Sequence, residues 1–288
     1  MRNNYLKRKV RQIVLEPKIL RDMQMIQLEM LIEFDRICRK YNITYSLDGG
    51  TLLGAIRHKG FIPWDPDIDV IMLHSDYQKF AKYCVNELDT NRFFLQDLDS
   101  DPHYRWGYAR LRRKGTEFIR AGHEHMKYKT GIFMDIMIVD NIPDSILGRY
   151  FYLFVGFCIR KSLWSEAGKF LHENWLMRKW YSFLSLIPRN IFVNLYKLIS
   201  NHYNKQNTYL IKRMLAPYPK SCKFGTKRKY YDELIEIEFE GYNFKAFKEY
   251  DEYLRFVYGD YMELPPQEER IPHIPCSKLT LVEPNLKG

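Results

Sequence analysis

The chain has 288 residues, 46% of them hydrophobic and 16% aromatic, which is ample for a packed interior and excludes a disordered or low-complexity protein. Its 45 Lys and Arg outnumber 35 Asp and Glu, and the net charge of +10 favours an anionic partner. No apolar run reaches the roughly 18 to 20 residues that a membrane-spanning helix needs.

The first predicted element is a long amphipathic helix that follows Pro17. Apolar residues recur at intervals of three or four between Ile19 and Tyr41, which is the spacing of one helical face. Residues 43–47 then read as a strand.

A glycine turn and a short helix come next. Gly49 and Gly50 allow a sharp turn and let backbone amides approach an anion closely. We expect a helix over 51–60 with Thr51 as its N-cap. Its N-terminal dipole would favour a phosphate at the same place.

Residues 61–72 set three aspartates at every second position in an apolar run. A strand would place Asp65, Asp67 and Asp69 on one face. The opposite face would carry Pro66, Ile68 and Val70. Three like charges on one face repel, and aspartate is a poor strand former. This stretch therefore needs a positive group beside it.

A helix around 75–88 and a strand over 104–112 follow. Alternation along the strand predicts one aromatic and cationic face. That face would carry Tyr104, Trp106, Tyr108, Arg110 and Arg112.

Residues 131–140 are apolar on both faces and predict a central, buried strand. Asp135 lies inside this run, and an isolated carboxylate is costly to bury unless it is paired or binds a metal. A Mg²⁺ ion shared with Asp67 and Asp69 would offset both the cost of burying Asp135 and the repulsion among the aspartates of 61–72. A structural ion pair of Asp135 with an arginine of the preceding strand stays open as the alternative.

The pattern from 143 to about 215 is helical and aromatic. Within it, 150–159 and 180–199 are apolar runs with Arg and Lys at their flanks. Two interpretations stay open, a membrane-interface segment and a helical core hairpin. The expected division is a catalytic core at 15–142, this helical insertion at 143–215 and a C-terminal region at 216–288 that packs on the core.

Residues 45–72, YSLDGGTLLGAIRHKGFIPWDPDIDVIM, resemble the signature of the LicD family of the nucleotidyltransferase-fold superfamily. Members transfer phosphocholine or related phospho-substituents to cell-surface glycans. The similarity continues through YARLRRKGTEFI, GIFMDIMIVDNIPD and FEGYNFKAFKEYDEYLRFVYGDYMELPP, and spans about residues 20–275. It implies an α+β fold, a nucleotidyltransferase-like mixed β-sheet core flanked by helices, with a helical insertion and a C-terminal extension.

The resemblance also implies roles for individual residues. Asp67, Asp69 and Asp135 match the catalytic carboxylates that hold Mg²⁺, with Mn²⁺ as the alternative. Residues matching the glycine-rich turn and the family's proline-tryptophan-aspartate signature are Gly49, Gly50, Thr51 and Asp65. Pro66 departs from the aspartate of many members, but by the alternation argument it faces away from the metal.

Further candidates would contact the donor. Those for its diphosphate are Arg57, His58, Arg110 and Arg112. Those for a quaternary ammonium, through cation–π attraction, are Trp64, Trp106 and Tyr108.

The implied reaction is attack of a glycan hydroxyl on the distal phosphorus of CDP-choline, with CMP leaving. The expected acceptor is a cell-surface glycan such as teichoic acid or lipopolysaccharide, or its undecaprenyl-linked precursor. Scattered cysteines and the lack of a secretory signal favour the cytoplasm, at the inner face of the cell membrane with a peripheral membrane contact. No nucleic-acid-binding module is recognised, so we expect no nucleic acid partner.

Three rival functions stay open. The first is nucleotidyl transfer to a small acceptor, or transfer of a different phospho-alcohol, on the same fold. The second is a D-x-D glycosyltransferase, against which the Gly-Gly-Thr turn and Asp135 argue. The third is a non-catalytic membrane-associated scaffold, which predicts that Asp67→Ala leaves cellular function intact.

Overall fold

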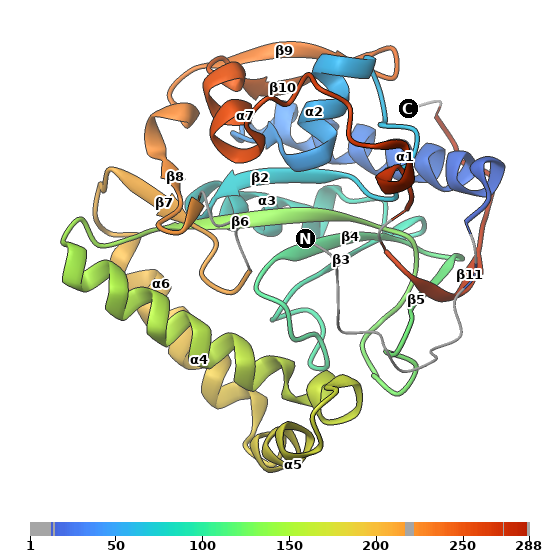
Figure 1. The fold of residues 1–288 in the computed structure, drawn as a ribbon. Coiled ribbons are helices and arrows are strands. Elements are labelled where there is room, and N and C mark those ends of the chain that lie inside the picture. The colour runs from blue at the N-terminus through green and yellow to red at the C-terminus, as the bar shows by residue number, and fades with distance from the viewer. Residues whose placement is uncertain (1–12, 14, 217–221, 273, 287–288) are drawn as a thin grey trace.

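The computed structural model describes residues 13, 15–216, 222–272 and 274–286, so the basic segment 1–12 lies outside the described residues. A mixed sheet occupies the centre, with β1-β2-β6-β4-β3 as its main path, and β7 joins β6 to β8 (Figure 1). These strands are β1 (Ser46–Leu47), β2 (Asp69–Leu73), β3 (Phe93–Gln96), β4 (Ala109–Arg113), β6 (Phe133–Asn141), β7 (Leu210–Lys212) and β8 (Thr226–Lys227). β2 and β6 are parallel, and the other pairs are antiparallel. The predicted α+β class and mixed sheet are confirmed.

β6 is the central strand, as predicted for 131–140. It pairs with β2 on one side and β4 on the other, and eight of its nine residues are buried. Because both of its edges are paired and both of its faces are covered, any polar side chain on β6 is held in a fixed place. Asp135 is such a side chain.

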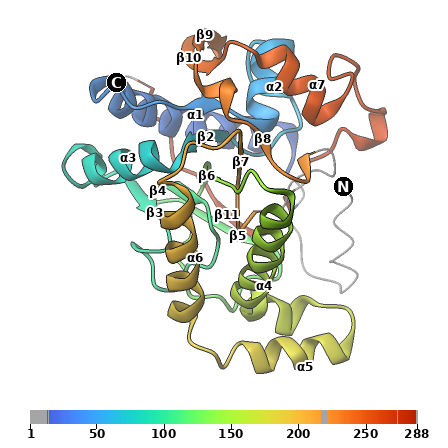
Figure 2. The same cartoon turned by 90° about the vertical axis from the view of Figure 1, so that its left-hand side faces the viewer.

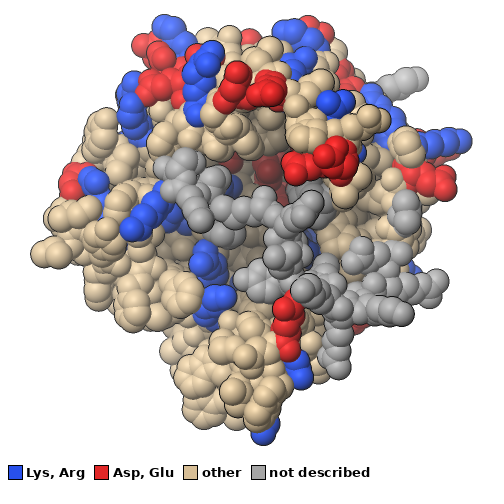
Figure 3. Space-filling model, in the orientation of Figure 1, with Lys and Arg blue, Asp and Glu red and all other residues tan. Residues whose placement is uncertain are grey.

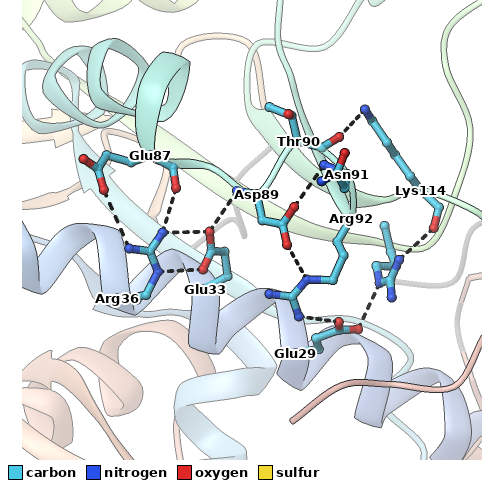
Figure 4. A network of polar contacts seen from close by, with 10 residues as sticks. Glu29, Glu33, Arg36, Glu87, Asp89, Thr90, Asn91, Arg92 and Lys114 are labelled. Carbon is cyan, nitrogen blue, oxygen red and sulfur yellow. Dashed lines mark hydrogen bonds and ion pairs between the residues drawn. The ribbon is translucent and has the colours of Figure 1, made fainter. Parts of the chain in front are cut away.

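Two helices cover one face of the sheet, α1 (Pro17–Lys40) and α3 (His74–Glu87). Both match the predicted helices, because their apolar residues follow the 3.6-residue period. Glu29 of α1 is 2% exposed and accepts hydrogen bonds from Arg92 Nη1 and Arg113 Nε, each at 3.0 Å (Figure 4). This buried, paired charge links α1 to the residue before β3 and to the end of β4.

A second layer lies above the sheet in Figure 1. It combines α2 (Gly49–His58) with the C-terminal elements β9 (Leu234–Phe239), β10 (Tyr242–Phe247) and α7 (Tyr250–Tyr258). Arg21 and Arg39 of α1 form ion pairs with Glu240 at 2.6 Å and Glu236 at 2.7 Å. The C-terminal region therefore packs on the N-terminal half of the chain.

Smaller elements complete the described chain. β5 (Glu117–Arg120) pairs with β11 (Cys276–Thr280) away from the main sheet. Two short 3-10 helices are η2 (Arg228–Tyr231) and η3 (Gln267–Glu269).

Three helices form a separate arm below the sheet, α4 (Ile146–Leu171), α5 (Trp175–Leu184) and α6 (Arg189–Tyr203), here called the helical arm (Figures 1 and 2). Asp140 of β6 anchors it. Its fully buried carboxylate accepts hydrogen bonds from Ser200 at 2.5 Å and Asn204 at 2.7 Å, and lies 3.0 Å from His74 Nδ1. Among the described residues, no helix is long and apolar enough to span a bilayer.

Several predicted boundaries differ from the structure. The strand predicted over 43–47 consists of Ser46–Leu47 only, and residues 210–212 of the predicted helical region form β7. The aspartate strand begins only at Asp69, and the strand predicted over 104–112 begins at Ala109. The helix after the glycine turn begins at Gly49, so the predicted N-cap role of Thr51 is wrong. Asp48 holds that position, and the Thr51 hydroxyl accepts a hydrogen bond from the Asp69 amide at 2.9 Å instead.

Candidate metal centre and active site

Three carboxylates meet at one point of the sheet. Asp67, Asp69 and Asp135 each offer an oxygen, and these oxygens all lie within 4.8 Å of one another. Asp69 and Asp135 are register partners on the parallel strands β2 and β6. Asp67 comes from the extended segment before β2, where alternation persists because Pro66 and Ile68 are buried. The structure thus brings together the three aspartates that the sequence singled out.

Two glutamines of α1 hydrogen-bond to the backbone of the extended segment that precedes β2. Gln24 Nε2 donates to the carbonyl of Asp65 at 2.9 Å. Gln27 Nε2 donates to the carbonyls of Pro66 at 2.9 Å and Phe133 at 3.0 Å. Sequence reasoning missed both residues, although glutamines on the buried face of an amphipathic helix are a signal in themselves.

The glycine turn lies directly against the aspartates. Gly49 has a φ of 54°, and a Cβ there would lie 3.0 Å from Asp69 Oδ2. A Cβ on Gly50 would lie 2.1 Å from Asp65 Oδ2. Only glycines allow this approach, which directs the positive N-terminus of α2 at the carboxylates.

Burial and mutual repulsion disfavour the ionised carboxylates. Burial raises the pKa of Asp69 well above its usual range, and Asp67, Asp135 and Asp48 raise it further. Burial and Asp67 likewise raise the pKa of Asp65. Oδ1 of Asp69 is buried without a hydrogen-bond partner among the described residues.

A divalent cation fits this arrangement. Hard cations such as Mg²⁺ and Mn²⁺ prefer carboxylate oxygens, and one bound here would neutralise the repulsion and give the orphaned Asp69 oxygen a partner. The donor set contains no nitrogen or sulfur ligand that would favour zinc. Asp67, Asp69 and Asp135 are therefore the residues able to hold the ion.

Arg110 forms the ion pair that the sequence left open as an alternative. Its Nε lies 2.6 Å from Asp135 Oδ1, its Nη2 is 3.3 Å from the Tyr108 hydroxyl, and its guanidinium lies 3.8 Å from the centroid of the Phe133 ring. Burial raises the pKa of Asp135, and Arg110 opposes that effect. The ion pair and the three-carboxylate cluster coexist, since Asp135 takes part in both.

Arg112, two residues further along β4, lacks a carboxylate partner among the described residues. Its Nε donates to Gln96 Oε1 at 2.5 Å and its Nη1 to the Gly131 carbonyl at 2.6 Å. Burial lowers its pKa to about 10. Its buried Nη2 has no hydrogen-bond partner in the described part of the chain. Arg112 thus supplies positive potential beside Arg110.

Arg57 and His58 stand at the far end of α2, about 12 Å along the helix from the glycine turn. Arg57 Nη1 donates to the carbonyls of Tyr261 at 2.9 Å and Glu263 at 3.2 Å. His58 meets the Trp64 ring edge-on at 6.3 Å. The structure does not group this pair with the carboxylate cluster, and their contact with the donor stays a prediction.

Two further segments add residues that sequence reasoning did not assign: Arg213, directly after β7, and two tyrosines of α7. The Tyr253 hydroxyl donates to Asp48 Oδ1, and Arg213 Nη1 lies 3.5 Å from Asp48 Oδ2. The Tyr258 hydroxyl would be 3.7 Å from a Cβ on Gly49, and its pKa is raised by burial and by Asp48 and Asp69. The similarity over residues 239–266 was the signal for the two tyrosines.

Trp106 and Tyr108 line a cavity of about 290 Å³. Tyr77 and Tyr196 add two more aromatic rings, and Asp97, Asp99 and Lys197 are also in its wall. Tyr108 connects this cavity to the cluster through Arg110. Trp64 lies elsewhere, with Arg270 5.7 Å from its ring centroid. Figure 3 shows acidic side chains inside a hollow in the middle of the face that it displays.

Comparison with known proteins gives a consistent result. Residues 42–141 match the family described as LicD/FKTN/FKRP, nucleotidyltransferase domain. The chain is 34% identical over 262 residues to the lipopolysaccharide cholinephosphotransferase LicD of Haemophilus influenzae, covering 88% of this chain and 95% of that protein. An uncharacterized protein of Rickettsia prowazekii is 42% identical over 124 residues, which is 43% of this chain and 41% of that protein. With the carboxylate cluster inside the matched region, the chain belongs to the LicD family.

Proposed function

We propose that this protein is a metal-dependent transferase that moves phosphocholine, or a related phospho-alcohol, from a CDP-linked donor to a hydroxyl of a cell-surface glycan. The supporting observation is the three-carboxylate cluster with its orphaned Asp69 oxygen, in a chain similar over most of its length to a lipopolysaccharide cholinephosphotransferase. Residues 15–142 form the catalytic core, of nucleotidyltransferase type, with 143–215 as an insertion and 216–288 as a C-terminal region.

Asp67, Asp69 and Asp135 would hold Mg²⁺, or Mn²⁺ in its place. The ion would supply charge neutralisation for the donor's pyrophosphate and for the leaving phosphate. The protein's own contribution is to keep three carboxylates together against their repulsion, which the paired strands and the glutamines of α1 achieve.

The glycine turn and the arginines would bind the donor. The amides at the N-terminus of α2 and the positive end of its dipole suit phosphate oxygens, and only glycine permits that close approach. Thr51 keeps this turn next to β2 through its bond to the Asp69 amide. Arg110 and Arg112 add positive potential on the β4 side.

Asp135 would orient the attacking hydroxyl and accept its proton at a carboxylate oxygen. Burial raises the pKa of Asp135, which favours proton acceptance, and Arg110 opposes this rise. The glycan oxygen would form the new bond to the distal phosphorus as the bond to CMP breaks.

The cavity lined by Trp106 and Tyr108 would take the quaternary ammonium of choline. Aromatic faces attract such a cation, and the Asp97 carboxylate adds negative charge, whereas Asp99 is paired with Lys197. The Tyr108 hydroxyl accepts a hydrogen bond from Arg110, so choline in this cavity would lie beside an arginine proposed to bind phosphate. Trp64 is the weaker candidate because it packs near Arg270.

A donor screen tests the function. The protein would be incubated with CDP-choline, CDP-glycerol, CDP-ribitol or a nucleotide sugar, with Mg²⁺ or with EDTA, and a glycan acceptor. We expect CMP release from CDP-choline that EDTA abolishes. Transfer of the nucleotidyl group would support the first rival, UDP release would indicate a glycosyltransferase, and no turnover with any donor would favour a scaffold.

Comparing CDP-choline with CDP-ethanolamine tests the ammonium cavity. Tyr108→Leu and Trp106→Leu should raise KM more for the trimethylated donor, because a primary ammonium depends less on aromatic faces. Trp64→Leu is the matched control. Equal effects on both donors would remove the cavity from the proposal.

The acceptor would be lipopolysaccharide, teichoic acid or an undecaprenyl-linked precursor at the inner face of the cell membrane. The lipopolysaccharide named for the Haemophilus influenzae relative supports the first of these. Assays of the three acceptors with one donor would distinguish them.

A further inference from the structure

We propose that the helical arm docks on an anionic membrane surface, with its exposed apolar side chains in the headgroup region and its basic side chains on anionic lipid. The inference concerns the surface of α4, α5 and α6, outside the carboxylate cluster. It adds one point to the proposed function, and only this point rests on that function: the acceptor is presented at a membrane.

The arm exposes an unusual amount of apolar surface. Of the 23 large hydrophobic residues that are exposed in the described chain, fifteen lie between Ile146 and Leu198. Leu147 is 81% exposed, Phe154 65% and Trp180 52%. Soluble monomers rarely present so large a contiguous apolar area without a partner. The others are Ile146, Tyr150, Phe151, Phe157, Phe170, Trp175, Leu176, Phe183, Leu186, Ile191, Leu195 and Leu198.

This exposure does not reflect poor packing of the arm. The inner faces of α4 and α6 form their own core, where Tyr152, Ile159 and Leu163 pack with Val193 and Tyr196, all at most 6% exposed. The exposed residues lie on the outward faces of the same helices. The inner face of the arm is therefore packed in a core of its own, whereas the outer face is apolar and exposed.

The outer face repeats at helical intervals. On α4 its exposed apolar residues include Leu147, Phe151 and Phe154. On α6 they include Ile191, Leu195 and Leu198. Phe151 and Leu198 also border an apolar groove of about 350 Å³ between α4 and α6. Two helices thus contribute to one continuous apolar surface.

The charge of the arm favours an anionic partner. Residues 146–203 contain eight Lys and Arg but only two Glu and no Asp. Several basic groups lie beside exposed rings, such as Lys179 Nζ at 4.8 Å from the Trp175 ring centroid. Aromatic rings at headgroup depth and basic groups reaching phosphate are the side-chain arrangement of an interfacial helix. A second copy of this chain would instead bring like charges together.

The arm would lie on the membrane, since none of its helices is long and apolar enough to cross one. In Figure 3 its surface is largely uncharged, with a few basic side chains. β6 carries both Asp140, which anchors the arm, and Asp135 of the cluster. Docking of the arm would therefore hold the carboxylate cluster at a set distance from the lipid.

Vesicle flotation of the full chain tests the inference. We expect binding to vesicles of phosphatidylcholine with phosphatidylglycerol, and much weaker binding to phosphatidylcholine alone. Combined Phe154→Ser, Trp180→Ser and Leu198→Ser should reduce binding at least about tenfold, since each removes apolar area from the interface. Arg160→Gln with Lys179→Gln should reduce it by about fivefold per charge at low salt.

The matched control replaces exposed apolar residues outside the arm, Val85→Ser with Ile271→Ser, and should leave binding unchanged. Equal binding of the triple variant and the wild type, or no binding to either vesicle, would overturn the inference. So would self-association that the triple variant abolishes without any vesicle binding. Turnover with a water-soluble acceptor should survive in the triple variant, so loss of docking is distinguishable from failure of the proposed reaction.

Discussion

Asp69 and Asp135 stand opposite each other on the parallel strands β2 and β6, and Asp67 reaches the same point from the segment before β2. The arrangement costs stability as it stands, because burial and repulsion both disfavour the ionised carboxylates. A fold that keeps such a cluster gains from it only when a cation or a substrate occupies the site.

Replacing Asp69 should separate stability from activity. Asp69→Asn keeps the shape of the side chain but removes one buried charge, so the metal-free protein should melt at a higher temperature. Loss of a residue that only hydrogen-bonds a metal ligand lowers metal affinity or activity roughly 10- to 100-fold. Loss of a ligand itself should lower turnover by more than that. Thermal unfolding without metal and CMP release with Mg²⁺ measure the two effects.

An exposed aspartate serves as the control for this variant. Asp22→Asn on the outer surface of α1 should change neither quantity, with a stability effect within about 0.5 kcal/mol. A lower melting temperature for Asp69→Asn, or retained turnover, would contradict the metal site.

The pH dependence of metal stabilisation follows from the raised pKa values of Asp65 and Asp69. A raised folded-state pKa adds stability below the ordinary carboxylate range, and that contribution is lost as pH rises through the raised values. A cation binds the ionised form, so Mg²⁺ should raise the melting temperature more at about pH 8 than at about pH 5.5.

Differential scanning fluorimetry at several pH values, with and without Mg²⁺, checks this expectation. Asp69→Asn should show a smaller and flatter response, because one titrating ligand is gone. An increase in melting temperature that is the same at every pH would mean that the ion binds elsewhere.

Arg110 should be essential to the metal-free protein. Arg110→Met leaves the Asp135 carboxylate buried without its cation, which costs about 3 to 5 kcal/mol. Mg²⁺ should restore part of this loss, since it places positive charge beside Asp135 again. Lower pH should also reduce the loss as Asp135 becomes protonated. Urea unfolding with and without Mg²⁺ measures each effect.

Arg36→Met is the matched control for Arg110→Met, because it also removes an arginine from an ion pair. Its pair with Glu33 is partly exposed on the arginine side, and its loss should cost about 1 kcal/mol or less with no response to Mg²⁺. If the two variants lose the same stability, or if Mg²⁺ fails to restore Arg110→Met, Asp135 does not face the ion.

The sequence predicted those parts of the site that depend on local periodicity. The 3.6-residue period located α1, and the apolar run on both faces located β6. Alternation assigned Asp67 and Asp69 to one face even though the strand itself begins only at Asp69. The burial of Asp135 indicated either a metal or an ion pair, and the structure contains the ion pair beside a cluster suited to a metal.

Contacts between distant segments were beyond that reasoning. The bonds from Gln24 to the carbonyl of Asp65 and from Tyr253 to Asp48 depend on how α1 and α7 pack, which no local pattern encodes. The N-cap assignment of Thr51 was wrong for a related reason. Asp48 and Thr51 are both good N-cap residues, and the positive φ of Gly49 together with the bond from the Asp69 amide decided between them.

Two glycines of α2 offer the sharpest test of how the turn serves the site. A Cβ on Gly50 would lie 2.1 Å from the Asp65 carboxylate, the end of a side chain that can rotate away. A Cβ on Gly54 would lie 2.4 Å from the backbone carbonyl of Gly60, which cannot. Gly50→Ala should therefore lower turnover strongly with little change in melting temperature, whereas Gly54→Ala should destabilise the whole protein.

Circular dichroism melts and CMP release on the same two preparations distinguish these outcomes. Gly50→Ala with a raised KM for the CDP-linked donor and a normal melt would locate the defect in the approach of donor phosphate to the helix N-terminus. The added Cβ must displace the Asp65 carboxylate and so change the geometry of the turn. A Gly50→Ala variant that turns over like the wild type would therefore show that Asp65 and the amides of the turn do not act on the donor.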